Sequence, residues 1–330
     1  MKKLVNDVHR VVPESLEGFA AAHSDVVSLH TNPLWVGRRQ PKEDGKVAVI
    51  SGGGFGHEPL HAGFVGPGML DAAVPGEIFT SPTPDAIEAA TRGSERGAGV
   101  LYLVKNYTGD VMNFDTAKEM TEDEDVSIRT VIVSDDCGVE HAENTAGRRG
   151  VAGTVLVEKI AGALAETGAR LDEVAAIAAR VNDSMATMGL ALTACTVPYI
   201  GHPSFDLEED QVEMGIGIHG EPGYRRGPME SAERLVEELY ERVRDAVELT
   251  RGEQVITLVN GMGATPESEL YICHRTVDTL LRADGVELAR PMVGNWVTSL
   301  DMAGMSLTIL KADAQMLELF DAPAFTAAWR

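Results

Sequence analysis

The sequence predicts an α/β protein with an N-terminal domain, whose mostly parallel sheet is flanked by helices, and a second, smaller α/β domain. Between Lys46 and about Met188, short β-branched runs alternate with helical segments, the usual pattern of strands and crossover helices in a parallel sheet. After Gly189, predicted strands become frequent and are separated by loops that contain proline and glycine. We therefore expect two domains, at residues 1–189 and 190–330.

In the first domain, we expect three strands, a crossover helix and an apolar helical stripe. The strands are Lys46–Ser51, Gly99–Lys105 and Val126–Val133. Between the first two, Thr83-Pro84-Asp85 provides a cap, a proline at the first helical position and an acid in the first turn, and the helix ends near Gly93. The stripe has apolar residues at helical spacing and is expected to pack in the core; it comprises Leu171, Val174, Ile177, Val181, Met185 and Met188.

The second domain is expected to contain five strands and two helices. The strands are Leu190–Val197, Gln211–Ile218, Glu253–Asn260, Val286–Val293 and Ser306–Leu310. The helices lie near Ser231–Leu249 and Pro266–Leu281. One face of the first helix is apolar, which predicts that it packs by that side on a sheet; this face comprises Leu235, Val236, Leu239, Val243 and Val247.

Composition excludes several classes of function. The chain has 330 residues, is 44% hydrophobic and carries a formal charge of −23, which argues against binding nucleic acid or an anionic membrane. Cys137, Cys195 and Cys273 are far apart without a C-x-x-C motif, so reduced thiols in a cytoplasm fit best. No apolar segment follows the basic amino terminus, and no run of 18 apolar residues occurs. Secretion and membrane spanning are therefore not expected.

The segment Ser51–Pro59 predicts a functional site. It follows the apolar run Val47–Ile50 and contains four glycines before His57. Such a loop places bare backbone N–H groups beside an imidazole at the carboxyl end of a sheet. Lys105–Asp110 follows the next predicted strand, so it should emerge at the same edge. There Asp110 is either a general base for a substrate hydroxyl or a helix-cap or turn aspartate.

Two further motifs suggest other chemistry, but their context argues against both. His57-Glu58-Pro59-Leu60-His61 matches the H-E-x-x-H pattern of zinc metalloproteases, yet the preceding glycines and Pro59 disfavour the required helix. Gly215–Gly220 matches the G-x-G-x-x-G dinucleotide fingerprint, but no helical pattern follows directly. His219 is then either a buried histidine held by backbone hydrogen bonds or a neutral nucleophile.

No phosphate-binding G-x-x-x-x-G-K-[ST] loop or kinase signature set occurs. If the chain handles phosphate, we expect its donor to be held elsewhere.

Six motifs together resemble the substrate-binding K subunit of bacterial dihydroxyacetone kinase. The likeness runs from about residue 5 to the chain end, through Ser299–Gly304. The motifs are Gly52-Gly53-Gly54, Gly56-His57-Glu58-Pro59, Gly76–Pro84, Lys105-Asn106-Tyr107-Thr108-Gly109-Asp110, Thr145–Gly150 and Gly217–Gly223.

The resemblance implies two α/β domains, a homodimer and a ketose site contributed by both domains. It implies that His219 forms a covalent hemiaminal with the ketone, that Asp110 is the base and that His57 contacts the substrate. Gly54, Phe55, Gly56 and Lys105 occupy the remaining pocket positions. A neutral imidazole adds reversibly to a carbonyl, which selects ketones over glycerol and leaves a terminal hydroxyl free for phosphorylation.

The resemblance also implies partners. The chain stops where two-domain kinases of the family continue into a nucleotide-binding domain. We therefore expect the phosphotransferase-linked type, in which an L subunit carries ADP or ATP with magnesium and an M subunit recharges it. No metal is expected on this chain.

The family usually has serine where Phe55 stands. If the ring points inward, it would reshape the pocket and favour another small ketose, such as a tetrulose. If the ring points away, substrate choice is unaffected. Another alternative is a ketone-sensing regulatory protein without turnover.

Overall fold

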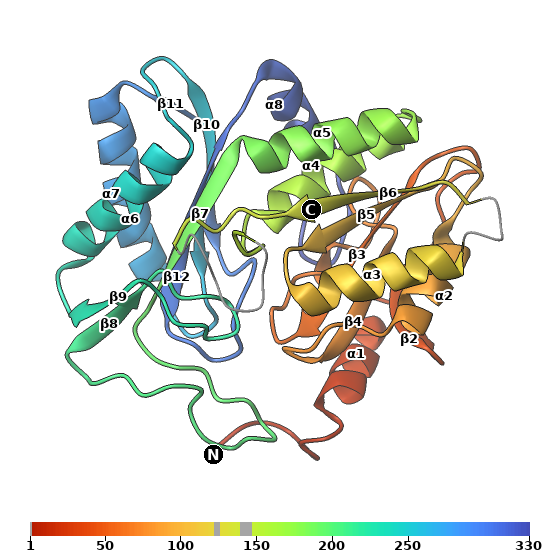
Figure 1. Cartoon of the computed structure of the whole chain (residues 1–330), viewed down its shortest axis with the longest axis horizontal. Coiled ribbons are helices and arrows are strands. Elements are labelled where there is room, and N and C mark those ends of the chain that lie inside the picture. Colours follow the sequence, from red (N-terminus) through yellow and green to blue (C-terminus); the bar gives the residue numbers. More distant parts are fainter. Residues whose placement is uncertain (1, 122–125, 139–146) are drawn as a thin grey trace.

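The computed structural model describes residues 2–121, 126–138 and 147–330 and contains two six-stranded sheets (Figure 1). The first sheet has the order β1-β2-β4-β3-β5-β6 and the second has the order β11-β10-β12-β7-β8-β9. The mixed α/β class predicted from the sequence is confirmed. The first sheet comprises β1 Val27–Thr31, β2 Leu34–Arg38, β3 Ala48–Phe55, β4 Ala72–Ile78, β5 Val100–Lys105 and β6 Ile128–Val133.

The first sheet is parallel at its centre. β3 pairs in parallel with β4 and β5, and β5 pairs in parallel with β6, whereas β1, β2 and β4 are joined by antiparallel pairings. Parallel neighbours bring the carboxyl ends of β3 and β5 to one edge of the sheet. The predicted loop at Ser51–Pro59 needs correction, because β3 continues through the glycines to Phe55 and the loop begins only at Gly56. Gly52 and Gly53 pair with neighbouring strands.

The second sheet is mainly antiparallel. Among its described strands, only β10 and β11 pair in parallel, and β12, β7, β8 and β9 follow in antiparallel order. Its strands are β7 Met185–Ala191, β8 Gln211–Met214, β9 Arg225–Pro228, β10 Gln254–Gly261, β11 Glu287–Gly294 and β12 Gly304–Lys311.

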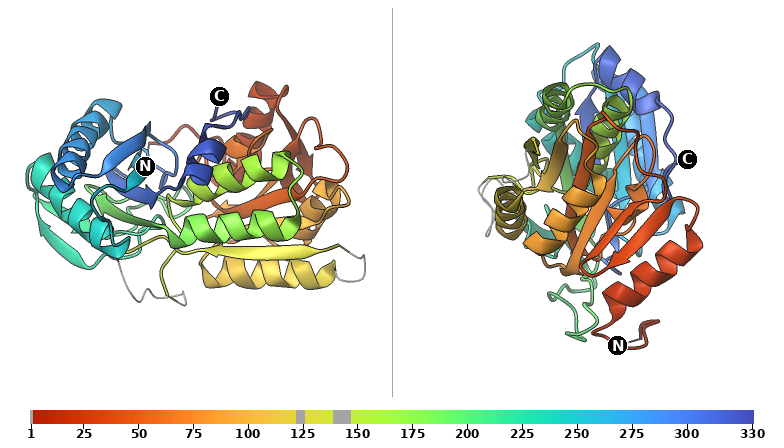
Figure 2. Two further views of the ribbon diagram at one scale, coloured as in Figure 1. Left: turned by 90° about the horizontal axis from the view of Figure 1, so that it is seen from above. Right: turned by 90° about the vertical axis from the view of Figure 1, so that its right-hand side faces the viewer.

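Helices cover both faces of the first sheet. On β3, Val49 packs in the same core as α4 and α5, while its neighbour Ile50 packs with α2 and α3, as the alternation of a strand requires. Helices α6 and α7 pack on the second sheet, and α8 contacts α4 (Figure 2). The helices are α1 Val11–Ala22, α2 Pro84–Ser94, α3 Thr108–Met120, α4 Thr154–Glu166, α5 Leu171–Asp183, α6 Ala232–Ala246, α7 Glu267–Asp284 and α8 Ala314–Asp321, with a short 3₁₀ helix η1 at Ala62–Phe64.

Several predicted elements are confirmed to within a few residues. Helix α2 begins after Thr83 with Pro84 at its start, and the capping Ser231 precedes α6, whose predicted apolar face is buried. The first three predicted strands correspond to β3, β5 and β6, and the last three to β10, β11 and β12. Most ends differ by one or two residues, which is ordinary for such boundaries, but β3 ends four residues beyond the predicted Ser51.

The predictions around residue 189 need correction. The predicted strand Leu190–Val197 is wrong, because the strand in this region is β7, Met185–Ala191. Helix α5 ends at Asp183, so Met185 and Met188 lie in β7 and not on the predicted helical stripe. All seven residues of β7 are buried, so it lacks the alternation that marks a half-exposed strand. The predicted domain boundary between residues 189 and 190 falls inside β7, and the division itself stays a prediction.

The predicted strand Gln211–Ile218 is also too long. β8 ends at Met214, and the chain turns at Gly215, whose φ is +81°. Residues 215–224 therefore form a loop between β8 and β9 that carries His219.

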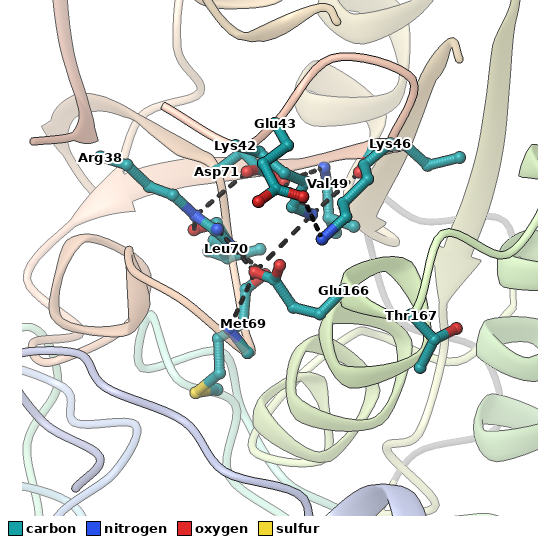
Figure 3. Close-up of polar contacts among 12 residues, drawn as sticks. Arg38, Lys42, Glu43, Lys46, Val49, Met69, Leu70, Asp71, Glu166 and Thr167 are labelled. Atoms are coloured by element: carbon teal, nitrogen blue, oxygen red, sulfur yellow. Dashed lines mark hydrogen bonds and ion pairs between the residues drawn. The ribbon is translucent and has the colours of Figure 1, made fainter. Parts of the chain in front are cut away.

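A buried cluster of charges joins the first sheet to α4 (Figure 3). This ion cluster consists of Arg38, Lys42, Asp71 and Glu166. Arg38 pairs with Asp71 at 3.0 Å and with Glu166 at 2.6 Å, and Lys42 pairs with Asp71 at 2.9 Å. Backbone N–H groups of Val49 and Gly68 donate to the two carboxylates. The cluster holds two positive and two negative charges, so its formal charge is balanced.

Within residues 2–121, 126–138 and 147–330, no helix has the length and apolarity needed to cross a membrane. The expected cytoplasmic location stays a prediction.

Candidate functional site

The glycines at the end of β3 allow two other segments to approach the strand closely. A Cβ at Gly53 would lie 2.2 Å from Lys105 Nζ, and a Cβ at Gly54 would lie 2.7 Å from the backbone of Phe79 and Thr80. The backbone contact at Gly54 is incompatible with a side chain, and a side chain at Gly53 would require the end of Lys105 to move. The glycine run therefore exists because Lys105 and the turn after β4 occupy the space that side chains would fill.

His57 follows this run and is held from the second sheet. Its ring is buried, with 1% of the residue exposed, and Nδ1 donates to the carbonyl oxygen of Thr298 at 2.8 Å. The backbone N–H of Thr298 donates back to the His57 carbonyl at 3.2 Å, and that of Leu300 donates to the Gly56 carbonyl at 2.8 Å. The connection between β11 and β12 thus fixes the orientation of the His57 ring.

His219 lies beside His57, with the ring centroids 4.8 Å apart. Its Nδ1 donates to a Glu221 carboxylate oxygen at 2.9 Å, and its backbone N–H donates to the other oxygen at 2.9 Å. Burial alone would raise the pKa of Glu221, but the charge and hydrogen bond of His219, together with Arg149, lower it to about 2. An ionised Glu221 favours the tautomer of His219 that carries its proton on Nδ1.

Aromatic rings surround His219. Phe79 and Tyr107 contact its ring edge to face, with centroids 5.2 Å and 4.6 Å away. Phe79 also stacks on His57 at 5.1 Å. These contacts restrict the ring to one orientation and make an apolar wall beside it.

Lys105 and Asp110 come from the end of β5 and the first turn of α3. Both are buried, and Lys105 Nζ lies 4.0 Å from Asp110 Oδ2. Burial lowers the pKa of Lys105, while the charges of Asp110 and Glu158 oppose that shift. Burial likewise holds the pKa of His57 well below its usual value, assisted by the charges of His219 and Lys105. His57 is therefore a neutral imidazole at pH 7.

The structure brings the predicted residues together in two contacts, His57 with His219 and Lys105 with Asp110. Phe55 belongs to the main core cluster and lines a small cavity with Leu16 and Phe19. Among the ring contacts of the described residues, none joins Phe55 to either histidine.

Sequence reasoning missed four neighbours of the histidines: Phe79, Tyr107, Glu221 and Thr298. Three of them lie inside motifs already recognised, and Glu221 is only two residues beyond His219, which is a usable signal for an imidazole partner. Of the predicted motif Thr145–Gly150, the first two residues lie outside the described residues.

The two other motifs lack the structure that their chemistry needs. Residues 57–61 form turns and not an α-helix, and the two histidines have different partners, Thr298 for His57 and Glu158 for His61. In the described ranges, no group of three or more His, Cys, Asp or Glu side chains is arranged as metal ligands. Gly215–Gly220 connects two antiparallel strands and does not open a helix.

Comparison with known proteins identifies the family. A family model described as the Dak1 domain matches residues 17–328. The PTS-dependent dihydroxyacetone kinase 1, dihydroxyacetone-binding subunit DhaK, of Listeria innocua is 49% identical, with 100% of both chains covered. The corresponding PEP-dependent subunit of Escherichia coli is 45% identical, with 99% of both chains covered. The full-length relatives thus make the chain a subunit of a phosphotransferase.

The chain belongs to the Dak1 family, and its recognition as a dihydroxyacetone kinase K subunit is confirmed. Solved structures agree with this assignment. The dihydroxyacetone kinase of C. freundii superimposes with a TM-score of 0.90 at 32% identity, covering 99% of this chain and 60% of the other. A dihydroxyacetone kinase operon co-activator, DhaQ, gives a TM-score of 0.90 at 36% identity, covering 96% and 97%. The same fold therefore occurs in a kinase and in a regulatory protein.

Proposed function

We propose that this chain binds dihydroxyacetone as a hemiaminal on His219 and presents its free hydroxyl for phosphorylation. The observation that carries the proposal is the pairing of His219 Nδ1 with Glu221 at 2.9 Å. A neutral imidazole that donates from Nδ1 keeps its lone pair on Nε2, which is the nucleophile that carbonyl addition needs. The names and full-length coverage of the bacterial relatives support dihydroxyacetone as the ligand.

Addition forms one bond, between Nε2 of His219 and the carbonyl carbon, and breaks the carbonyl π bond. The carbonyl oxygen takes one proton from solvent water, and the Nδ1 proton of the imidazole leaves to solvent by way of Glu221, so the number of protons is unchanged and the adduct is neutral. His57 donates from Nδ1 to Thr298, and its Nε2 has no hydrogen-bond partner within the part of the chain that the structure describes. That nitrogen is available to accept a hydrogen bond from the new hydroxyl.

In the second step, Asp110 takes the proton of the terminal hydroxyl as the hydroxyl oxygen attacks the phosphoryl group. Lys105, 4.0 Å from Asp110, stabilises negative charge there, so catalysis is by positioning and electrostatics. The phosphoryl donor is a nucleotide on a separate L subunit, which an M subunit recharges, and this chain acts as a homodimer. The longer C. freundii kinase, solved with AMP-PNP and Mg²⁺, supports ATP with magnesium as the donor.

A regulatory function is the second candidate, because the co-activator covers 96% of this chain with a TM-score of 0.90. The bacterial kinase subunits have higher identities, 45% and 49% against 36%. The distance of 4.0 Å between Lys105 Nζ and Asp110 Oδ2 supports a base beside a cation. We therefore favour the kinase subunit, in which a base is needed, over a sensor, in which binding alone is enough.

Native mass spectrometry of the ketose adduct also tests which small ketose the site prefers. A relative from Solanum lycopersicum, 43% identical and covered over 57% of its length, is described as a putative 3,4-dihydroxy-2-butanone kinase. Because Phe55 packs in the core, we expect its ring to leave the preference for dihydroxyacetone over a tetrulose unchanged.

Native mass spectrometry tests the hemiaminal. The wild-type protein and His219→Ala are each offered dihydroxyacetone, an unphosphorylated tetrulose and glycerol. We expect a dimer that gains one ketose per subunit, ignores glycerol and loses the adduct in His219→Ala. An adduct that persists in the variant would overturn the assignment of His219.

The Asp110→Ala variant distinguishes the kinase function from the regulatory function. We expect the variant to keep the ketose adduct while turnover with the L subunit falls by about 10²–10⁴-fold, the usual contribution of a general base. The measurement is formation of dihydroxyacetone phosphate with the L and M subunits supplied. Unchanged turnover would exclude Asp110 as the base, and absence of turnover in the wild type would favour the regulatory function.

A further inference from the structure

Behind the glycine run, three buried side chains from different elements form a continuous hydrogen-bonded chain. Lys105 Nζ lies 2.8 Å from His61 Nε2, and His61 Nδ1 lies 2.5 Å from Glu158 Oε1. Lys105 and Glu158 are 0% exposed and His61 is 6% exposed. With Asp110, 4.0 Å from Lys105, they make what we call the site cluster. None of the comparisons assigns a role to His61 or Glu158.

Both ring nitrogens of His61 are engaged, so the chain has two proton arrangements. In the charged one, the Lys105 ammonium donates to Nε2, and Nδ1–H donates to the Glu158 carboxylate. In the neutral one, Nε2–H donates to the Lys105 amine, and a Glu158 carboxylic acid donates to Nδ1. Both arrangements contain the same number of protons and make both hydrogen bonds.

The surroundings favour the neutral arrangement more than water would. Burial raises the pKa of Glu158 well above its usual value, against the charge of Lys105, and lowers that of Lys105, against Asp110 and Glu158. Burial also holds His61 neutral, together with the charges of Lys105 and His57. Glu158 Oε2 has no hydrogen-bond partner in the ranges that are described. The nearby Ser51 hydroxyl lowers the pKa of Glu158, but it donates to the Leu103 carbonyl at 2.7 Å, so the carboxylate has few donors to stabilise its charge.

The charge of Asp110 changes the relative free energy of the two proton arrangements. An ionised Asp110 at 4.0 Å favours the ammonium form of Lys105, whereas a protonated Asp110 removes that attraction. We propose that Lys105, His61 and Glu158 form a proton relay whose arrangement follows the protonation state of Asp110. His61 and Glu158 are thus positioning residues, which act on the reaction through Lys105.

The relay deepens the proposed function and rests on it. When Asp110 takes the substrate proton, the N–H bond of Lys105 breaks as His61 Nε2–H forms, and His61 Nδ1–H breaks as the Glu158 O–H forms. The site then contains no unpaired buried charge while Asp110 is protonated. When Asp110 releases its proton, the same bonds re-form in reverse and Lys105 is charged again. No oxidant, reductant or metal takes part.

The nitrogen that carries the His61 proton gives a direct test. We would record ¹⁵N NMR spectra of histidine-labelled wild-type protein, Asp110→Asn and Asp110→Ala, with His61→Gln used for assignment. We expect the proton of His61 on Nδ1 in the wild type and on Nε2 in both Asp110 variants. His57 is the internal control, because its Nδ1 is bonded to the Thr298 carbonyl and should stay protonated throughout. The same protonated nitrogen of His61 in all three proteins would overturn the relay.

Glu158→Gln tests the consequence for turnover. Glutamine preserves the shape and one hydrogen bond but cannot take the proton, so the His61 tautomer should no longer respond to Asp110→Asn. We expect the ketose adduct on His219 to be retained, turnover to fall about tenfold, less than for the base itself, and the pH profile of kcat to shift. The matched control is Glu166→Gln on the same helix, which should leave kcat and its pH profile unchanged.

The outcomes separate the relay from the proposed function. Absence of a ketose adduct in the wild type would refute the function while leaving the tautomer switch intact. A normal adduct and normal turnover in Glu158→Gln, with an unchanged pH profile, would refute the relay while leaving the function intact. A fall in turnover without a change in pH profile would mean a structural role only and would also overturn the relay.

Discussion

The ion cluster and the site cluster differ in how completely their charges are paired, although one helix supplies a carboxylate to each. Glu166 and Glu158 both lie on α4. Glu166 contacts Arg38 at 2.6 Å and the backbone N–H of Gly68 at 3.0 Å. Glu158 contacts His61 through one oxygen, and its second oxygen has no hydrogen bond in the described structure, although the Ser51 hydroxyl is near enough to lower the pKa of Glu158.

The difference appears in the pKa values of the two glutamates. Burial pushes both pKa values upward, but Arg38 and Lys42 reverse the shift for Glu166, whose pKa is lowered. For Glu158, burial prevails over Lys105 and the pKa is raised well above its usual value. The comparison teaches that a cluster whose carboxylates each face two cations fixes its protons, whereas one with fewer cations than carboxylates can redistribute them.

The largest expected effect comes from breaking the ion cluster at its centre. Asp71→Asn leaves Arg38 and Lys42 buried with one carboxylate in place of two. We expect the free energy of unfolding to fall by about 3–5 kcal/mol, the usual cost of removing one partner of a buried pair, while the folded protein keeps its ketose adduct. Urea unfolding measures the first quantity and native mass spectrometry the second. A loss below about 1 kcal/mol would show that water replaces the lost charge.

A smaller effect is expected from displacing the amine of the site cluster. In Gly53→Ala, the new methyl group would lie 2.2 Å from Lys105 Nζ and 3.4 Å from His61 Nε2. Because the end of a lysine can move, we expect a loss of only about 1 kcal/mol in unfolding free energy, but a fall in turnover of about tenfold.

The control for this variant is Gly18→Ala, on α1, where a Cβ has no heavy atom within 4 Å. It should raise the unfolding free energy by about 0.5–1 kcal/mol and leave turnover unchanged. Normal turnover in Gly53→Ala would mean that the position of the Lys105 amine does not matter for the reaction.

The smallest effect is expected from Glu166→Gln and depends on pH. The pKa of Glu166 is lower in the folded protein than its ordinary value of 4.5, so its stabilisation is present above about pH 4.5 and is lost as pH falls. We expect a cost of about 0.5–1 kcal/mol at pH 7, discounted because water reaches this side chain, and none near pH 3. Unfolding free energies of both proteins at the two pH values measure this. An equal cost at both would assign it to hydrogen bonds and not to charge.

Much of the fold could be predicted because its signals are local. Caps, prolines and apolar spacing located α2, α6 and α7, and β-branched runs located β3 and β5. The strand β4 was missed because Pro75 and Gly76 lie inside it and read as a turn. The strand β9 was missed because Arg225 and Arg226 make half of this short segment charged.

The site could be predicted only in part. The strand-end rule brought Lys105 and Asp110 to the same edge as His57, and the family resemblance supplied the role of His219. The partner of His57, by contrast, is the carbonyl of Thr298, 241 residues away, and no local pattern specifies a contact at that separation. His61 was noticed only as part of a zinc motif, because its contact with Glu158, 97 residues away, is likewise tertiary.

The connection that holds Gly56 and His57 has a consequence for mutagenesis. Three hydrogen bonds join this connection to Gly56 and His57. The connection contributes the Thr298 carbonyl and the N–H groups of Thr298 and Leu300 to them, and all three groups belong to the main chain. An alanine scan leaves these three bonds in place and, in Thr298→Ala, removes only the hydrogen bonds of Thr298 Oγ1, the shorter of which is donated to the Glu58 carbonyl at 2.9 Å, so it would miss the main-chain contribution of this segment. Replacing the amide of Leu300 by an ester, through chemical semisynthesis, is the perturbation that would expose its contribution.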